Sequence, residues 1–233
     1  MTTHAPYSFA YQPIVDIERR EVFAYEALVR GKNGESAGSV FQQVPDGELH
    51  AFDRDIRADA IGLAARLGLR TRLSLNVLPQ SVLLVPDAVN TTLDAARRHG
   101  IAADCLILEV TEGELIADAA RFAERMNSFR SEGVKLAIDD FGAGYSGLNL
   151  LCDFQPDVLK LDMNLVRGVN ASGPRQAVVR AVIQACDDLG IEVIAEGVET
   201  QDEFDWFRRT GLRLFQGFLF GRPGFEALAA PTF

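Results

Sequence analysis

Short β-rich runs alternate with amphipathic helical stretches along the chain, and this alternation limits the possible folds more than any other feature. The helical stretches have apolar residues three and four positions apart, which places one stripe of each helix on a core. Strands and helices that alternate in this way through 233 residues are typical of an α/β fold. Eight strands are predicted, over residues 9–15, 23–30, 72–78, 106–111, 134–141, 158–162, 192–198 and 214–220.

Eight strands, most of them followed by a helix, favour a closed (β/α)8 barrel of the TIM type. An open doubly wound sheet is the alternative architecture. The first two strands are joined by residues 16–22, which is too short for the helix that connects parallel neighbours. We therefore expect the first strand to be antiparallel to the second. The sequence has no obvious linker or internal repeat, so residues 1–233 are predicted to form a single domain.

The composition is close to the average for soluble globular proteins, with 48% hydrophobic and 24% charged residues. The 23 basic and 33 acidic residues give a net charge of −10, which repels polyanions, so we expect no DNA or RNA polymer as a partner. No apolar run approaches the ~20 residues of a membrane-spanning helix, and membrane insertion is not expected. The N-terminal segment lacks the layout of a signal peptide, which predicts a cytoplasmic location.

Polar residues lie in or at the carboxyl ends of predicted strands that are otherwise apolar. In a closed barrel these side chains converge at one mouth, where barrel enzymes have their active sites. The residues are Glu26, Asn76, Glu109, Asp139, Asp140, Lys160, Asp162, Glu196 and Gln216.

Carboxylates that converge in this way cannot all stay ionised without a counter-charge. Oxygen ligands from Asp, Glu and Asn suit Mg²⁺ or Mn²⁺ better than Zn²⁺. The adjacent Asp139 and Asp140 suit two ions, since one carboxylate can bridge both while the other binds the second ion alone. A single acid of this kind is more often a solvated strand end or a helix cap. Six acids in register favour a two-metal site for phosphoryl chemistry instead.

A glycine-rich stretch after the fifth predicted strand suggests a different site. Gly142, Gly144 and Gly147 match the spacing of a dinucleotide-binding fingerprint, and Asp162 follows at the distance of a ribose-binding acid. However, Asp139 and Asp140 would face the pyrophosphate and repel it. A Rossmann-type dinucleotide site is therefore the weaker alternative.

A series of short motifs also runs through nearly the whole chain. In order, they are Gln12-Pro13-Ile14-Val15, Tyr25-Glu26-Ala27-Leu28-Val29-Arg30, Leu75-Asn76-Val77, Glu109-Val110-Thr111-Glu112, Asp139-Asp140-Phe141-Gly142-Ala143-Gly144-Tyr145-Ser146, Leu159-Lys160-Leu161-Asp162, Ala195-Glu196-Gly197-Val198-Glu199-Thr200 and Gln216-Gly217-Phe218-Leu219-Phe220. Together they resemble the EAL domain, the bacterial cyclic di-GMP phosphodiesterase module. Mild departures from the family pattern occur at Gly31, Ala143 and Phe218.

The resemblance implies hydrolysis of the second messenger cyclic di-GMP to linear pGpG, with two Mg²⁺ or Mn²⁺ ions as cofactors. It also implies a barrel whose first strand is antiparallel. The implied ligands of one ion are Glu26, Asn76, Glu109 and Asp139, and those of the other are Asp139, Asp140 and Glu196.

The same resemblance assigns further roles. Lys160 would lie beside the attacking water with Asp162 next to it, and Glu112 would order the glycine-rich loop after the fifth strand. Arg30 would contact a ligand phosphate. The implied catalytic set is Lys160, Glu196, Asp162 and Glu112, and the implied substrate-binding set is Arg30, Leu28, Gln216 and Gln12.

Simpler interpretations of several of these residues stay open. Lys160 can form a salt bridge with Asp162, two residues away on the same strand face. Arg30 can be a surface charge at a strand end, and Glu112 can be a first-turn helix acid. For Glu199 helix capping is favoured, because the following residues fit a capping box.

Such families also contain members that bind the ligand or a protein partner without hydrolysing it. Those members usually lack metal ligands or the loop, and here all are present, which favours a competent enzyme. A catalytically inert receptor or a protein-interaction module is the alternative. Related domains often dimerise near the loop after the fifth strand, so a homodimer through this loop is a further possibility.

Overall fold

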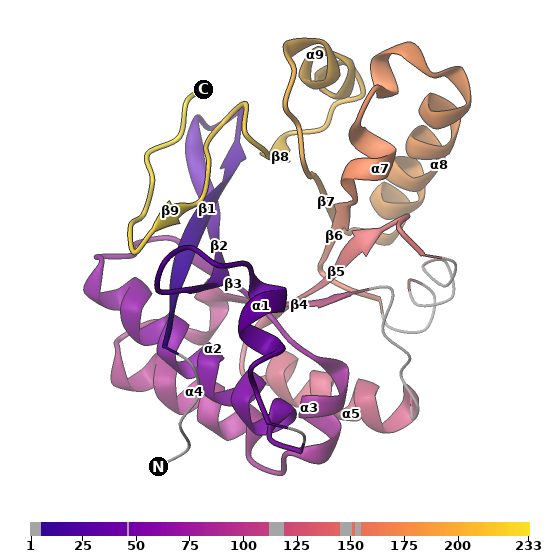
Figure 1. Ribbon diagram of the computed structural model, residues 1–233. Helices are drawn as coiled ribbons and strands as arrows, with labels where there is room; N and C mark the ends of the chain where they lie inside the picture. Colours follow the sequence, from indigo (N-terminus) through magenta and orange to yellow (C-terminus); the bar gives the residue numbers. More distant parts are fainter. Residues whose placement is uncertain (1–5, 46, 112–118, 145–150, 152–154) are drawn as a thin grey trace.

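The computed structural model describes residues 6–45, 47–111, 119–144, 151 and 155–233 (Figure 1). All eight predicted strands are present, and a ninth short strand follows them. The strands are β1 (Tyr7–Asp16), β2 (Glu21–Gly31), β3 (Arg72–Asn76), β4 (Leu106–Thr111), β5 (Lys135–Phe141), β6 (Val158–Leu161), β7 (Glu192–Ala195), β8 (Leu214–Gln216) and β9 (Gly224–Phe225).

The strands close into a barrel. Neighbours pair in the order β2-β3-β4-β5-β6-β7-β8-β1, and β1 pairs with β2 again to complete the ring. Pairs from β2 to β8 are parallel, whereas β1 is antiparallel to both β2 and β8. The predicted barrel with an antiparallel first strand is therefore confirmed. The open doubly wound sheet is wrong, and with it the fold that a Rossmann-type site requires.

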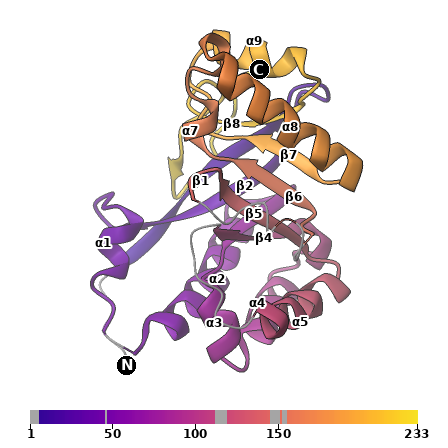
Figure 2. The same cartoon turned by 90° about the vertical axis from the view of Figure 1, so that its right-hand side faces the viewer.

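Helices cover the outside of the ring. In Figures 1 and 2, α2 to α5 lie on one side of the strands and α7 to α9 on the opposite side. None of the described helices is both long and apolar enough to cross a membrane. The helices are α1 (Ala37–Phe41), α2 (Leu49–Arg66), α3 (Pro79–Leu84), α4 (Ala88–Arg98), η1 (Ala103–Cys105), α5 (Ala119–Ser131), α7 (Met163–Val166), η2 (Val169–Ala171), α8 (Gly173–Leu189) and α9 (Gln201–Arg209).

Strands β7 and β8 are shorter than the apolar runs predicted, and a glycine explains where each stops. Gly197 and Gly217 have positive φ values of 67° and 157°. A Cβ on Gly217 would lie 2.1 Å from the carbonyl oxygen of Val198, so the two loops are in backbone contact here. Val198 N–H donates to Gln216 O at 3.1 Å, which joins the loops in place of a longer strand ladder.

A small inner core lies below the polar residues of the strands. Its members come from seven strands, and most lie two positions before a polar residue at the mouth, because side chains alternate along a strand. These buried residues are Ile14, Phe23, Ala24, Ile107, Ala137, Val158, Ile194 and Leu214. A larger apolar core fills the space between strands and helices. The polar layer thus lies on an apolar plug at the carboxyl ends of the parallel strands.

The seam between β1 and β8 is short, and the C-terminal segment extends it. β1 pairs with β8 only over Asp16 to Ile14, whereas it pairs with β2 along its whole length. Further along β1, Ala10 pairs with Phe225 of β9, which the sequence analysis did not predict. Tyr25 Oη then donates to Ala229 O at 2.9 Å, and Thr232 N–H donates to Phe220 O at 2.8 Å.

Candidate functional site

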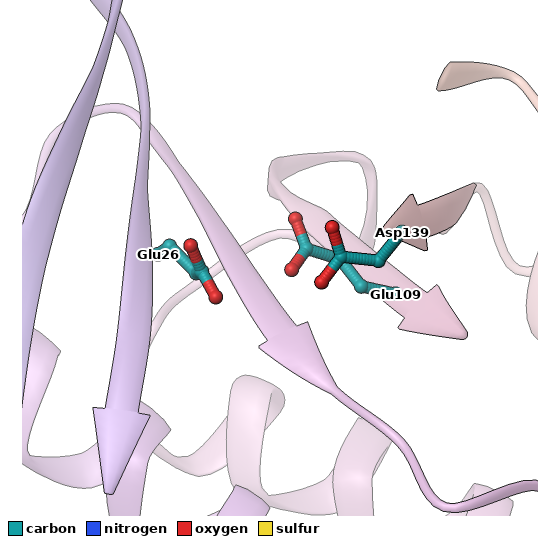
Figure 3. Close-up of side chains that lie close together, drawn as sticks. All are labelled: Glu26, Glu109 and Asp139. Atoms are coloured by element: carbon teal, nitrogen blue, oxygen red, sulfur yellow. The ribbon is translucent and has the colours of Figure 1, made fainter. Parts of the chain in front are cut away.

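Two groups of three carboxylates meet at the mouth of the barrel. Glu26, Glu109 and Asp139 form the first triad, and Asp139, Asp140 and Glu196 form the second. In each triad one oxygen per residue lies within 4.8 Å of the others. Figure 3 shows the Glu26 carboxylate, from β2, pointing toward those of Glu109 and Asp139. The structure therefore brings together the acids that the sequence placed at separate strand ends.

Lys160 lies among these acids and is 1% exposed. Its ion pairs are not with Asp162, whose side chain instead accepts from Asn164 N–H at 2.8 Å and caps α7. The partners of Lys160 Nζ are Glu196 Oε1 at 2.7 Å, Glu109 Oε2 at 2.9 Å, Asp139 Oδ1 at 3.1 Å and Glu26 Oε2 at 3.5 Å. The ammonium group is thus surrounded by carboxylates from three strands, β2, β4 and β5, and by that of Glu196, which directly follows β7.

Neutral side chains orient the first triad. Asn76 Nδ2 donates to Glu26 Oε1 at 3.0 Å, and Gln216 Nε2 donates to Glu26 Oε2 at 2.7 Å. On the other side, Ser74 Oγ donates to Glu109 Oε1 at 2.5 Å. The same Gln216 amide donates to Gln12 Oε1 at 3.3 Å, across the seam between β8 and β1. Ser74 was missed by the sequence analysis, although it lies two residues before Asn76 on the same strand.

Asp140, the last residue but one of β5, has an unusual backbone. Its φ is 55°, in the left-handed region, and Gly142 follows with a φ of 98°. Asp140 N–H donates to Asp139 Oδ1 at 2.9 Å. The turn therefore fixes both carboxylates at the end of one strand and lets both join the second triad.

Burial and mutual repulsion shift the pKa values of the acids. Burial, opposed by the charge of Lys160, raises the pKa of Glu109 to about 8. Burial and the neighbouring Asp139 raise the pKa of Asp140 to about 6, and Asp162 adds to the effect. Burial also raises the pKa of Glu196 well above its usual value. Burial acts to lower the pKa of Lys160, but the surrounding carboxylates outweigh it and raise that pKa.

The donor set fits hard divalent cations. It consists of carboxylate and amide oxygens, the ligands that Mg²⁺ and Mn²⁺ prefer. Asp139 belongs to both triads, as a carboxylate shared by two neighbouring ions would. Gln216 adds a buried Oε1 with no hydrogen-bond partner among the described residues. The described residues could therefore accommodate one ion or two.

A cavity of about 310 Å³ opens beside the carboxylates. Glu26, Leu28 and Arg30, at alternate positions of β2, form part of its wall, and Gln12 and Gln216 form another part. All four residues predicted to bind substrate thus line one cavity. Further lining residues that the sequence analysis did not assign to substrate are Met163, Arg167, Gly197, Glu199, Gly217, Phe218 and Pro223.

Glu199 and Arg167 show what spacing alone misses. The capping box of α9 is present, with Thr200 and Glu203 as its members, as predicted. Glu199 is nevertheless part of the cavity wall, and its Oε1 accepts from Arg167 Nη2 at 2.8 Å. The pair joins the loops after β6 and β7, so only tertiary structure reveals it. Glu112, Tyr145, Ser146 and Gly147 lie outside the described residues.

Comparison with known proteins identifies relatives over nearly the whole chain. A family model described as the EAL domain matches residues 5–223. The blue light- and temperature-regulated antirepressor BluF of Escherichia coli K12 is 38% identical over 227 residues, covering 96% of this chain and 56% of BluF. The cyclic di-GMP phosphodiesterase NbdA of Pseudomonas aeruginosa is 33% identical over 226 residues, covering 91% of this chain and 28% of NbdA. The chain thus spans about half the length of BluF and less than a third of NbdA.

Solved structures give the same result for the fold. A standalone EAL protein from Vibrio cholerae O395, crystallised in its c-di-GMP-bound form, superposes with a TM-score of 0.92 at 42% identity. The match covers 97% of this chain and 95% of that protein. Klebsiella pneumoniae BlrP1 in a manganese and cyclic di-GMP complex at pH 9.0 gives a TM-score of 0.93 at 42% identity, covering 100% of this chain and 61% of BlrP1.

Proposed function

The chain belongs to the EAL domain family, and from this premise we propose that it hydrolyses cyclic di-GMP to linear pGpG with two Mg²⁺ or Mn²⁺ ions. The names of relatives support the substrate, since NbdA is a cyclic di-GMP phosphodiesterase and the Vibrio cholerae structure contains c-di-GMP. The observation that carries the proposal is the pair of carboxylate triads that share Asp139 at the barrel mouth.

We assign the ions to the two triads. Glu26, Glu109 and Asp139, with Asn76 beside them, would bind one ion, and Asp139, Asp140 and Glu196 would bind the other. Bound ions of this kind supply a nucleophile at neutral pH and neutralise the charge that develops on the phosphate oxygens. Ser74 and Gln216 keep Glu109 and Glu26 aimed at the mouth through their hydrogen bonds. These contacts reduce the freedom of the ligands before any ion binds.

Lys160, Glu196 and Asp162 complete the proposed catalytic set. Lys160 contributes a buried positive charge next to the reacting phosphate, where charge-assisted hydrogen bonds are strong. Asp162 fixes the start of α7 through its cap, and this helix carries Met163 at the cavity wall. Glu112 stays a prediction as the residue that orders the loop after β5.

The cavity beside the acids would receive the dinucleotide. Arg30 lies at the end of β2 and its guanidinium would contact a phosphate of the ligand, while Leu28 and Gln12 would form the wall near it. Exposed Phe218, 45% accessible, lies on the rim, whereas Phe215 and Phe220 are buried core. Phe218 thus belongs to the pocket wall, and Phe215 and Phe220 belong to the core.

Turnover by the purified protein tests the proposal. We expect cyclic di-GMP to be converted to linear pGpG in the presence of Mg²⁺ or Mn²⁺, and the reaction to stop when EDTA is added. Chromatography of the products distinguishes pGpG from intact ligand. Tight binding without any product, at saturating Mn²⁺, would exclude the phosphodiesterase.

A ligand-responsive regulator is the second candidate function. It is favoured by one observation, the 38% identity with BluF, which is named an antirepressor. Calorimetry with cyclic di-GMP separates the two, because a regulator binds the ligand and leaves it intact.

Three wider features belong to the same proposal. We propose that residues 1–233 form one EAL-type domain, and that it acts in the cytoplasm, where a bacterial second messenger is found. A homodimer through the loop after β5 stays a prediction, because most of this loop lies outside the described residues.

A further inference from the structure

Lys160 has more negative neighbours than a residue that only contacts substrate requires. Its Nζ contacts every member of the first triad and two members of the second. Among the described residues, Lys160 is the cation with which Glu26, Glu109, Asp139 and Glu196 form their ion pairs. The charge of Lys160 is therefore the nearest compensation for several buried carboxylates.

The carboxylates that contact Lys160 are the ones assigned to the divalent ions. A Mg²⁺ ion lies about 2.0–2.1 Å from its oxygen ligands, closer than Nζ lies to any of its partners. An ammonium group and a divalent cation that use the same oxygens at this range repel each other. The ammonium group of Lys160 and the divalent ions therefore cannot all keep their contacts with these carboxylate oxygens at the same time.

We propose that Lys160 is the internal counter-ion of the two triads and that it withdraws from Glu26 and Glu109 when the divalent ions bind. The inference rests on the proposed function only in taking the triads as the ion site. The lysine side chain has a flexible four-carbon stem, so a small rotation about its bonds moves Nζ without moving β6. A lysine that compensates the acids in this way stabilises the protein before the ions arrive and opposes their entry.

A substitution cycle tests the proposal without measuring turnover. Lys160→Met removes the charge and keeps most of the side-chain volume. The matched control is Lys135→Met, since Lys135 Nζ pairs with Glu192 Oε2 at 3.0 Å at the amino end of β5, away from the triads. Thermal unfolding of each protein is measured with EDTA and with saturating Mn²⁺.

We expect Lys160→Met to lower the unfolding midpoint in EDTA and to regain the wild-type midpoint in Mn²⁺. Lys135→Met should keep the same deficit in both conditions. In calorimetry, Lys160→Met should bind Mn²⁺ at least tenfold more tightly than wild type, and Lys135→Met should bind it unchanged. If Lys160→Met does not fold, Lys160→Gln, which keeps a hydrogen-bond donor, takes its place.

The withdrawal itself can be followed by NMR in the wild type. The chain has three lysines, Lys32, Lys135 and Lys160, so selective ¹³Cε labelling gives three signals. Addition of Mg²⁺ should shift the Lys160 signal and leave the Lys135 signal in place. An unmoved Lys160 signal at saturating Mg²⁺ overturns the proposal.

Other results also overturn it: unchanged or weaker Mn²⁺ binding by Lys160→Met, a midpoint deficit that Mn²⁺ does not remove, or no Mn²⁺ binding by wild type. The proposed function fails separately. If the wild type binds Mn²⁺ as expected but leaves cyclic di-GMP intact, the proposed phosphodiesterase activity is excluded, whereas the proposed counter-ion role of Lys160 is retained.

Discussion

Asp140 combines a proposed ligand position with a left-handed backbone, and this makes one substitution especially informative. Asn tolerates a φ of 55° about as well as Asp does, so Asp140→Asn removes charge without adding backbone strain. We expect hydrolysis to fall to background while the fold survives, because the second triad loses one of its three carboxylates. Steady-state kinetics and circular dichroism measure the two properties. Asp188→Asn, on the exposed face of α8, is the control, and a wild-type rate for Asp140→Asn at saturating Mg²⁺ would contradict the two-ion assignment.

The raised pKa values of Glu109 and Asp140 predict how stability depends on pH. A carboxyl with a higher pKa in the folded protein than in the unfolded chain binds more protons when folded, so stability falls as pH rises. The pKa of Asp140 rises from 3.8 to about 6 and that of Glu109 from 4.5 to about 8. In EDTA, the free energy of unfolding should therefore decrease between about pH 4 and pH 8.

Divalent ions should reverse this trend, because they compete with the same protons. We expect Mn²⁺ to bind more tightly, and to stabilise the protein more, as pH rises from about 5 to 8. Urea unfolding with and without Mn²⁺ at several pH values measures both effects. Mn²⁺ binding that is independent of pH over this range would show that the acids are already ionised.

Lys160 has a different expected signature in kinetics. Lys160 is buried, and under the proposed function it lies beside the reacting phosphate, so it should contribute to the transition state more than to ligand binding. Lys160→Ala should lower kcat and leave the affinity for cyclic di-GMP nearly unchanged. Equilibrium binding and single-turnover kinetics separate the two quantities. Collapse of ligand affinity with intact single-turnover chemistry would assign Lys160 to substrate binding instead.

At the scale of the strand, two-residue periodicity made most of the site predictable. Glu26, Glu109 and Glu196 each follow an inner-core residue by two positions, so they share its side of the strand and extend beyond it to the mouth. Ser74 shares one face of β3 with Asn76, two positions later, but an uncharged serine in a strand gave no signal of its own. Arg167 could not be predicted, because its place depends on α7 and on Glu199 from another loop.

The predicted C-terminal ends of β7 and β8 were wrong, and the reason is physical. Apolar residues resume beyond Gly197 and Gly217, and an isolated glycine in a strand pattern is compatible with a bulge, so the predicted strands were continued too far. The strands end because the backbones at Val198 and Gly217 approach each other too closely for any side chain. Such a contact joins residues far apart in the chain, and a single sequence does not show it.

This contact gives an element-scale prediction. Gly217→Ala would place a Cβ against Val198 O, so the loops after β7 and β8 must separate. We expect a loss of about 2–4 kcal/mol in stability and lower activity, since Glu196 and Gln216 adjoin these loops. Gly211→Ala is the matched control, because Gly211 also has a positive φ, 87°, but a Cβ added there would meet no atom within 4 Å. Equal losses in urea unfolding would show that backbone strain alone is responsible.

For the whole molecule, barrel closure depends on the C-terminal segment. β8 covers only one end of β1, and β9 with the following residues covers part of the rest. Deleting residues 224–233 removes the backbone hydrogen bond from Glu226 to Phe9 and those made by Ala229 and Thr232. Ser8 Oγ also donates to Glu226 Oε1, so these four hydrogen bonds are lost, and at about 1 kcal/mol each the protein should be destabilised by about 4 kcal/mol. Thermal unfolding measures this loss of stability, and a chain ending at Ala229, which keeps β9, should lose less. Identical unfolding midpoints for the full chain and the chain without residues 224–233 would show that the segment adds nothing to closure.

The two-layer interior of the barrel has a consequence for how such a protein can change during evolution. The apolar residues inside the barrel support folding, whereas the polar layer at the mouth, which consists of mutually repelling acids, carries the proposed chemistry. Under the proposed function, loss of an acid would therefore remove activity without removing the apolar core, and it would also relieve repulsion. A duplicated gene can thus drift to a catalytically silent descendant that still folds and still has a ligand-sized hollow. In this architecture, few substitutions are needed to convert an enzyme into a sensor.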